Sequence, residues 1–335
     1  MDGELKVRSD ILAENAALVA KKYRLDYRLM ALGGAFTYLN SGSAADEAEL
    51  DDSKRIMRDR LKLFSGSKAI SSSSYLKCVI ACKMAQCANP EEFLDNVNCA
   101  WGVLSKHFSY SIYLGNAAYT LATCCKVKEY EAVALKAKEI YKLNKHRHFL
   151  ITNGKDISEC ILQAMTSMSA EELVNNSEEC FKLLKKNIRK ADSAQSMAFI
   201  STVFNGTNED KCDDIIKFYR KLKDEKVKIS SPLIQPFIAL PALCGVADDN
   251  FVDGIKEVEQ YFKRHKNLKM FGLNMQQRYM LAISVVMTSR LSKIERDVEI
   301  KASILQETVT NMLVEQVIAA ETEYTVTAIA AVANS

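Results

Sequence analysis

One sequence pattern returns along the chain with a period of about 40 residues. Each copy has a capping residue, an acidic first helical turn and an amphipathic helix that ends in lysines and arginines, and a shorter apolar helix precedes it. The copies begin near Asn89, Lys126, Ser169, Thr207 and Asn250. This period is typical of stacked helix pairs. The sequence therefore predicts an all-α fold: an α-solenoid of helix-pair repeats, similar to a tetratricopeptide superhelix.

The composition of the chain changes at two places. A serine-rich stretch over 65–74 separates three expected helices from the repeats. After residue 290 apolar residues continue at helical spacing, and the sequence then becomes rich in alanine and threonine. We therefore expect an N-terminal helical subdomain at 1–64, a helix-pair array at 75–289, and capping helices with a frayed tail at 290–335.

Three of the four prolines fall within one expected helix, over 232–243. Pro232 suits a first helical turn, whereas Pro241 lies too deep in the helix and should kink or end it, because proline removes a backbone donor. Backbone carbonyls that lose their donors need other partners, so a pocket could open at Pro236 and Pro241. A tolerated irregularity near the end of the array is the alternative interpretation, and the sequence does not separate the two.

Composition and cysteine placement restrict the class of protein. Hydrophobic residues make up 48% and charged residues 26% of the chain, which is typical of a globular protein, and the net charge of +3 does not by itself imply nucleic acid. Most of the ten cysteines lie in helical patterns, there is no Cys-x-x-Cys, and no apolar run is long enough to span a membrane. These features predict a reduced, soluble, cytoplasmic protein.

Motifs for common cofactors and catalytic centres are missing from the sequence. It has no Gly-x-Gly-x-x-Gly, no Walker lysine loop, no Gly-x-Ser-x-Gly and no His-Glu-x-x-His. The acidic stretch 46–52 lacks the order of an EF-hand and is better explained as the acidic first turn of a helix. We therefore predict no catalytic residues, no metal site and no cofactor, although spacing alone does not exclude a triad assembled from distant residues.

The repeated basic helix ends are the candidate binding residues. In a solenoid, equivalent helix ends line up along one edge, so they would form a basic ridge able to bind RNA phosphates or an acidic protein segment. The simpler interpretation is that cations at helix C-termini stabilise the helix dipole. The candidate ridge comprises Lys142, Lys145, Arg147, Lys185, Lys186, Arg189, Arg220, Lys221, Lys263 and Arg264.

Three segments resemble a bacterial family catalogued only as a domain of unknown function, number four thousand and three in that series. They are Arg28-Leu29-Met30-Ala31-Leu32, Phe149-Leu150-Ile151-Thr152, and the stretch from Pro232 to Pro241 ahead of Tyr261-Phe262. The resemblance covers most of the chain and implies a cytoplasmic, all-helical protein of this size. It implies no active site, substrate or cofactor.

Three functions are compatible with these observations. The leading hypothesis is a binding scaffold without enzymatic activity that holds a peptide or protein partner in a concave groove. The second is binding of RNA or another polyanion along the basic ridge. The third is an enzyme with an unrecognised site near the proline-rich helix. The sequence predicts no membrane partner and does not define the oligomeric state.

Overall fold

The computed structural model describes residues 1–23, 29–39, 41–61, 74–232, 234–291, 304–305, 307–316 and 318. These residues form helices and connecting turns, and no β-strand occurs among them. The all-α class is therefore confirmed. Within the same residues, no helix combines the length and apolar character that a membrane crossing requires.

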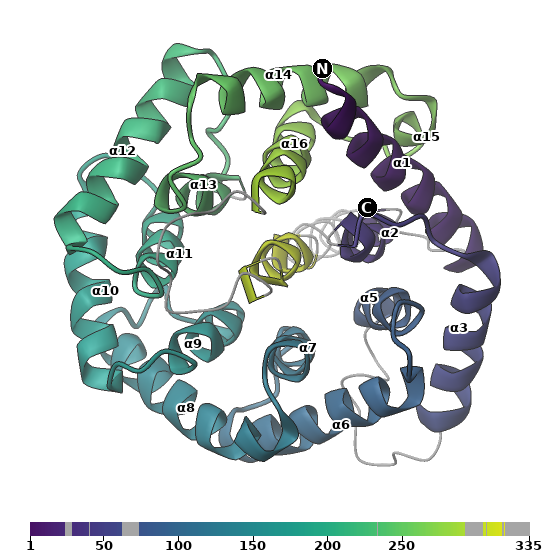
Figure 1. Ribbon diagram of the computed structural model, residues 1–335. Coiled ribbons are helices and arrows are strands. Elements are labelled where there is room, and N and C mark those ends of the chain that lie inside the picture. Colours follow the sequence, from purple (N-terminus) through teal and green to yellow (C-terminus); the bar gives the residue numbers. More distant parts are fainter. Residues whose placement is uncertain are drawn as a thin grey trace, which may run out of the picture.

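The helices form a ring of two layers, in which each outer helix is followed by an inner one (Figure 1). The outer layer contains α1 (Gly3–Tyr23), α3 (Glu47–Leu61), α6 (Pro90–His107), α8 (Tyr130–Arg147), α10 (Ala170–Lys185), α12 (Asn208–Asp224) and α14 (Asp249–Arg264). The inner layer contains α2 (Leu29–Phe36), α5 (Ser74–Met84), α7 (Leu114–Cys124), α9 (Ile157–Ala164), α11 (Ala191–Ser201), α13 (Ala239–Leu243) and α16 (Met275–Arg290). Shorter turns of helix lie between them: η1 (Thr37–Leu39), η2 (Val127–Glu129), η3 (Gly154–Asp156), η4 (Gln235–Ile238) and α15 (Lys266–Lys269).

Side-chain caps set the starts of several outer helices. The backbone N–H of Glu92 donates to Asn89, that of Glu172 to Ser169, and that of Asp210 to Thr207, at 3.1–3.2 Å. These caps confirm the predicted starts. The start predicted near Asn250 is two residues late, because Asp248 accepts the N–H of Phe251 at 2.7 Å and caps α14.

The two layers differ in how much of each helix is buried. Outer helices bury one stripe and keep the opposite face in water, as the sequence pattern indicates. Every residue of the inner helix α9 is buried, and so is nearly all of α11, because these helices lie between the outer layer and the interior of the ring. Burial on all sides explains why the inner helices read as short apolar runs in the sequence.

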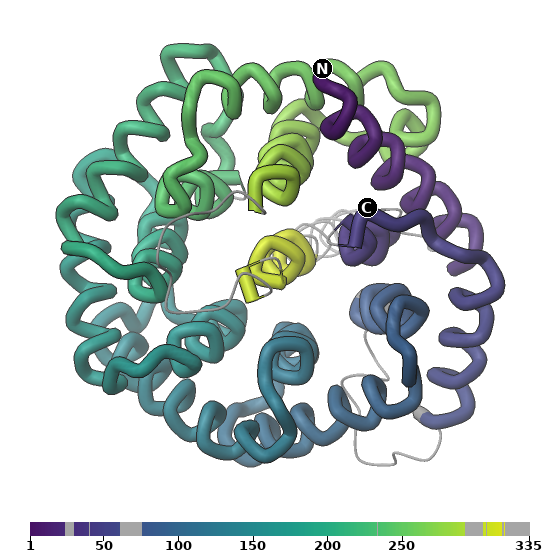
Figure 2. Tube along the Cα trace, viewed as in Figure 1, coloured from purple at the N-terminus to yellow at the C-terminus, as the bar shows by residue number. Residues whose placement is uncertain are grey.

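The array of helix pairs closes on itself, which differs from the open superhelix expected from the repeat. Helix α1 packs against α14, α15 and α16, so the first helix covers the last pair (Figure 2). Gly254 of α14 allows the close approach: a Cβ there would lie 3.2 Å from Leu5 Cδ1 and 3.4 Å from Val286 of α16. A closed ring buries the terminal faces that an open solenoid leaves to water.

The first helices share a core with the repeats, although the sequence predicts a subdomain at 1–64. Buried residues of α1 and α2, such as Leu12 and Phe36, belong to one apolar cluster with residues of α12, α14 and α16. The predicted serine-rich linker over 65–74 lies outside the described residues, except for Ser74, which begins α5.

A further helix occupies the middle of the ring. We call the helical residues 304–305, 307–316 and 318 the central helix; it is drawn in yellow in Figure 1. Leu305, Val309, Met312 and Leu313 are buried against the surrounding helices. The sequence predicts that this segment caps the stack; instead, it fills the interior of the ring. The predicted frayed tail after residue 318 lies outside the described residues.

The expected proline-kinked helix over 232–243 is two shorter elements. Pro236 lies in the first turn of η4, and Pro241 is the third residue of α13, so both stand where a helix needs no N–H donor. Helix α13 ends when Gly245 takes a positive φ of 69° and the N–H of Val246 donates to the carbonyl of Pro241 at 3.1 Å. The prolines therefore divide the segment rather than kink one helix.

Candidate binding site

Neighbouring outer helices meet end to start, and opposite charges face each other at the junctions. Arg60 at the end of α3 pairs with Glu91 and, at 2.9 Å, with Asp95 at the start of α6. Lys221 near the end of α12 pairs with Asp249 at the start of α14 at 2.6 Å. The repeated acidic starts and basic ends are thus complementary surfaces between successive repeats.

At these junctions, the residues of the predicted basic ridge lie in different surroundings. Arg147 donates to the carbonyl of Val174 and to Asn175, and Arg220 donates to Asn187 at 2.8 Å. Lys185 donates to the carbonyl of Arg189. Lys186, Lys263 and Arg264 are exposed at the surface. The contacts of Arg147 and Arg220 connect consecutive repeats around the ring.

Two of the ridge residues line a basic hollow of about 620 Å³ at the end of α8. Lys142 and Lys145 lie there with Lys138, and Lys145 stands over the ring of Tyr141 at 5.6 Å. Burial, followed by the charges of Lys142 and Lys145, lowers the pKa of Lys138. Burial disfavours the charged ammonium, and the two neighbouring lysines add repulsion between like charges. Arg189 lines a different hollow, between α10 and α12.

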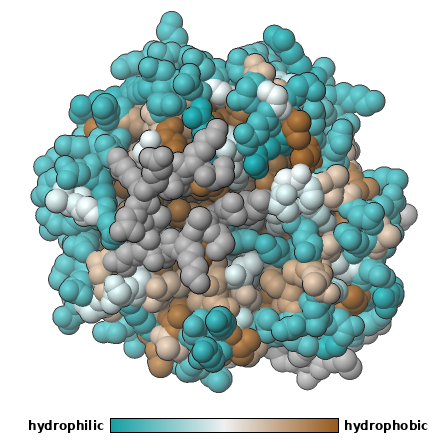
Figure 3. Space-filling model, viewed as in Figure 1, coloured by the Kyte–Doolittle hydropathy of each residue, from teal (hydrophilic) through white to brown (hydrophobic). Residues whose placement is uncertain are grey.

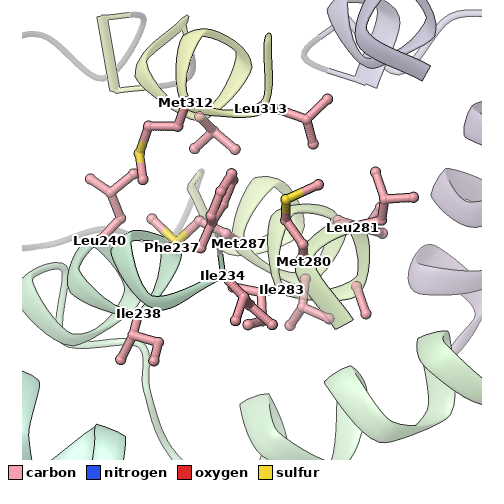
Figure 4. Packing of buried hydrophobic residues seen from close by; sticks show 14 of the residues in the cluster. Ile234, Phe237, Ile238, Leu240, Met280, Leu281, Ile283, Met287, Met312 and Leu313 are labelled. Atoms are coloured by element: carbon pink, nitrogen blue, oxygen red, sulfur yellow. The ribbon is translucent and has the colours of Figure 1, made fainter. Parts of the chain in front are cut away.

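A cavity of about 550 Å³ lies between the central helix, α2, the start of α16 and the segment before η4. Figure 4 shows Met280 and Leu281 of α16 near Leu313 of the central helix, with Ile234 beneath them. Leu32, Leu273 and Met275 complete the apolar wall. Cavities of this size hold a small ligand or a few side chains. On the face drawn in Figure 3, hydrophilic residues cover most of the rim, and hydrophobic residues show in separate patches among them.

The polar side chains that described residues contribute to this cavity are uncharged at neutral pH. They are two serines and four side-chain amides: Ser230, Ser231, Asn274, Gln276, Gln277 and Gln316. Gln276 donates through Nε2 to Ser230 Oγ at 3.3 Å, while its Oε1 is buried and has no hydrogen-bond partner. Asn274 caps α16 by accepting the N–H of Gln277. The cavity therefore offers hydrogen-bonding groups but no acid, base or nucleophile of perturbed pKa.

The predicted pocket prolines do not line this cavity. Pro236 and Pro241 are buried in the core, and the contact with the cavity comes from Ile234, two residues before Pro236. The predicted pocket at these two prolines therefore stays a prediction, and the cavity described here takes Ile234 from the same segment. Its periodicity shows Asn274 to Gln277 only as a helix cap, and that cap is also part of the cavity rim.

A buried group of carboxyls lies between α7, α9 and the central helix, and no sequence pattern marks it. Asp156, Glu159 and Glu315 are 0%, 7% and 5% exposed. Asn116 of α7 donates to Glu315 at 3.3 Å and to Ser158 at 3.4 Å. Burial raises the pKa of Asp156 to about 7 and that of Glu315 to about 8, and burial with the nearby Glu315 raises the pKa of Glu159.

This cluster of three carboxyls is closed to solvent, and Glu315, with a pKa of about 8, is largely protonated at neutral pH. Burial favours the uncharged form of each carboxyl. Lys155 lies beside the group and pairs with Asp192 at 3.0 Å. A second contact fixes the central helix, where Glu307 pairs with Lys83 of α5 at 2.5 Å and accepts from Tyr119 at 3.3 Å. The acids therefore attach the central helix to the ring.

Metal binding has no support in the described part of the chain. Within it, no group of three or more His, Cys, Asp or Glu side chains is arranged to hold a metal ion. The acidic stretch 46–52 is engaged locally: Asp46 accepts the N–H groups of Ala48 and Glu49, and Lys22 pairs with Glu47 at 2.7 Å.

Comparison with known proteins gives one result. A sequence family described as "Protein of unknown function (DUF4003)" matches residues 17–323. No curated protein and no solved structure matches the chain.

Proposed function

The chain belongs to the DUF4003 family of proteins of unknown function, the one that its sequence resembles, and from the geometry we propose a non-enzymatic protein that binds a short apolar peptide segment. The observation that supports this proposal is the cavity of about 550 Å³ with an apolar wall and an uncharged rim. The bound segment belongs to a peptide or protein partner, as the leading sequence hypothesis states.

The rim favours a peptide over a purely apolar molecule. Carboxamide side chains carry both a donor and an acceptor, so they can match the N–H and C=O of a peptide bond. Gln276 has a buried oxygen without a partner, and an incoming backbone N–H can donate to it. A buried acceptor without a partner costs about 1–3 kcal/mol, and a peptide that satisfies it gains that amount. The apolar wall of Ile234, Met280 and Leu281 takes the side chains.

The enzyme alternative lacks a reactive group in the same cavity. Catalysis by acid–base or nucleophilic chemistry needs a titratable side chain within reach of the substrate. Of the described residues that line the cavity, none is Asp, Glu, His, Cys, Lys, Arg or Tyr. The buried carboxyls of Glu159 and Glu315 lie away from solvent. These observations favour binding over turnover.

Replacing Met275 with glutamate is expected to weaken peptide binding at least tenfold. Met275 lines the cavity and is 42% exposed, so the substitution places a charge at the rim with little effect on stability. A tenfold loss corresponds to about 1.4 kcal/mol, less than the cost of burying an unpaired charge. The measurement is fluorescence polarisation with labelled seven-residue peptides that carry Leu, Met or Phe at the centre and uncharged flanking residues.

Met270 provides the matched control. It is 40% exposed and lies outside the cavity, so Met270→Glu makes the same chemical change elsewhere on the surface. The control should bind peptide like the unaltered protein. Equal loss in both variants, or no binding of any apolar peptide by the unaltered protein, contradicts the proposal. Equally tight binding of small apolar molecules without a peptide group would contradict the role of the amide rim.

A cytoplasmic location is also part of the proposal. All ten cysteines have free thiols, and six of them are buried. Proteins of oxidising compartments use cysteines mainly in disulfides. The free thiols support a reducing environment.

A further inference from the structure

We propose that a second, basic cavity between the ends of α10 and α12 binds a small phosphate ester. This cavity has a volume of about 590 Å³ and lies beside the peptide cavity, with which it shares Ser230. The inference is independent of the proposed function, because it rests on different residues and a different kind of ligand.

The lining of the basic cavity carries positive charge without compensation. Five cationic side chains from the described part of the chain line it, and no carboxylate from that part does; the five are Arg189, Lys190, Lys223, Lys226 and Lys228. Among the residues that the structure describes, none of the five forms an ion pair within 4.0 Å. Phosphate groups are the natural partners of such a cluster, because several ammonium and guanidinium groups can donate to one phosphate at once.

Nearby carboxylates are engaged elsewhere. Glu225 pairs with Lys256 at 2.5 Å, and Asp249 pairs with Lys221 at 2.6 Å. Asp224 and Glu225 line a separate hollow together with Asp213 and Asp214. Asp224 and Glu225 thus line one hollow, together with Lys217, Arg220 and Lys221, whereas Lys223 and Lys226 line the other.

The backbone at Lys226 gives a second, independent reason to assign a ligand. Lys226 has a φ of 59°, and among the described residues no other non-glycine residue has a positive φ. It follows the end of α12, where the N–H of Val227 donates to Leu222 and that of Lys226 to Lys223, at 2.9 and 3.0 Å. This helix ending strongly favours glycine at the Lys226 position. A lysine held there against its conformational preference points to a role for its side chain.

The remaining lining indicates the rest of the ligand. Ser230 and Gln235 supply a hydroxyl and an amide, and Gln235 Oε1 is buried without a hydrogen-bond partner. That oxygen is an acceptor, so it binds a hydroxyl of the ligand and not its phosphate. The cavity therefore suits a phosphate ester with a free hydroxyl, such as a sugar phosphate or nucleotide. A long RNA strand is less suitable, because the other basic hollow, at Lys142 and Lys145, lies at a different helix end.

The test is titration calorimetry at low salt with ribose 5-phosphate, inorganic phosphate, ribose and a ten-residue uridine oligonucleotide. We expect ribose 5-phosphate to bind, inorganic phosphate to bind more weakly, and ribose not to bind. Arg189→Gln and Lys226→Gln should each weaken ribose 5-phosphate binding at least tenfold. Lys106→Gln on the exposed end of α6 makes the same charge change outside the cavity and should bind normally.

Lys226→Gly distinguishes lost binding from lost folding. Glycine adopts the positive φ without strain, so this variant should unfold at a higher temperature than the unaltered protein while binding ribose 5-phosphate at least tenfold more weakly. Unchanged affinity in Lys226→Gly and Arg189→Gln, or an equal loss in Lys106→Gln, overturns the proposal. Binding of the oligonucleotide alone also overturns it and supports an RNA surface. Loss of peptide binding in Met275→Glu would not change the ribose 5-phosphate result, because the two ligands bind in different cavities.

Discussion

Replacing Gly254 with leucine is expected to lower the free energy of unfolding by about 3 kcal/mol. The added Cβ alone would lie 3.2 Å from Leu5 Cδ1 and 3.4 Å from two methyl carbons of Val286, and the rest of the side chain has no space at this junction. Overpacking a buried contact typically costs about 1–3 kcal/mol. The substitution pushes α1 away from α14 and α16, where the ring closes. Equilibrium unfolding in urea measures the effect.

Gly102 of α6 is the matched control for this prediction. Apart from the nearby backbone of its own helix and its two chain neighbours, no heavy atom lies within 4 Å of the position that its Cβ would take, so Gly102→Leu adds the same side chain without a clash. Glycine within a helix is less favourable than leucine by somewhat under 1 kcal/mol, so this variant should be slightly more stable. If both variants unfold at the same urea concentration, α1 does not close the ring in solution.

Replacing Glu315 with glutamine is expected to stabilise the protein at high pH and to change little at pH 4. Burial raises the pKa of Glu315 from its ordinary value of 4.5 to about 8. Its contribution to stability is fully present below pH 4.5 and is lost as the pH rises through 8, because the unfolded chain releases the proton first. Glutamine keeps the hydrogen bond from Asn116 without this loss. At pH 9 we expect the free energy of unfolding of Glu315→Gln to exceed that of the unaltered protein by roughly 3 kcal/mol. Each pKa unit corresponds to about 1.4 kcal/mol, and hydration of the ionised carboxylate offsets part of the full difference.

The measurement is urea unfolding of both proteins at pH 4, 6, 8 and 9, with the difference in unfolding free energy plotted against pH. Glu139 of α8 lies at the surface, so Glu139→Gln serves as the control and should give a flat difference. A flat difference for Glu315→Gln as well would mean that this carboxyl is solvated and that the central helix does not bury it.

Local features of the sequence predicted the elements of the fold well. Asn89, Ser169 and Thr207 cap the helices that they were expected to start, because a cap depends only on residues within one turn. The position of the central helix could not be predicted in this way. Its apolar spacing predicts a helix and does not say whether that helix covers the end of a stack or fills a ring.

The sites were harder to predict because each is assembled from distant segments. The peptide cavity combines Leu32, Ile234, Met280 and Leu313, which no periodic pattern connects. The predicted basic ridge assumed that equivalent helix ends share one edge. In the ring, the end of one outer helix meets the start of the next, so Lys221 pairs with Asp249 while Arg189 lines a cavity. The charge at a helix end could be predicted from the sequence, but the residue that pairs with it could not.

Closure of the ring also sets an order in time. Asp10 of α1 accepts a hydrogen bond from Tyr261 of α14, and the two residues are 251 positions apart. At ribosomal rates of about 5–20 residues per second, α1 is complete roughly 10–50 s before its partners in the last pair exist. During that interval the face of α1 that carries Leu5 has no native partner to cover it. Helix α1 is therefore synthesised well before the helices that cover it, and we expect chaperones that shield apolar surfaces to bind nascent chains of this protein during that interval.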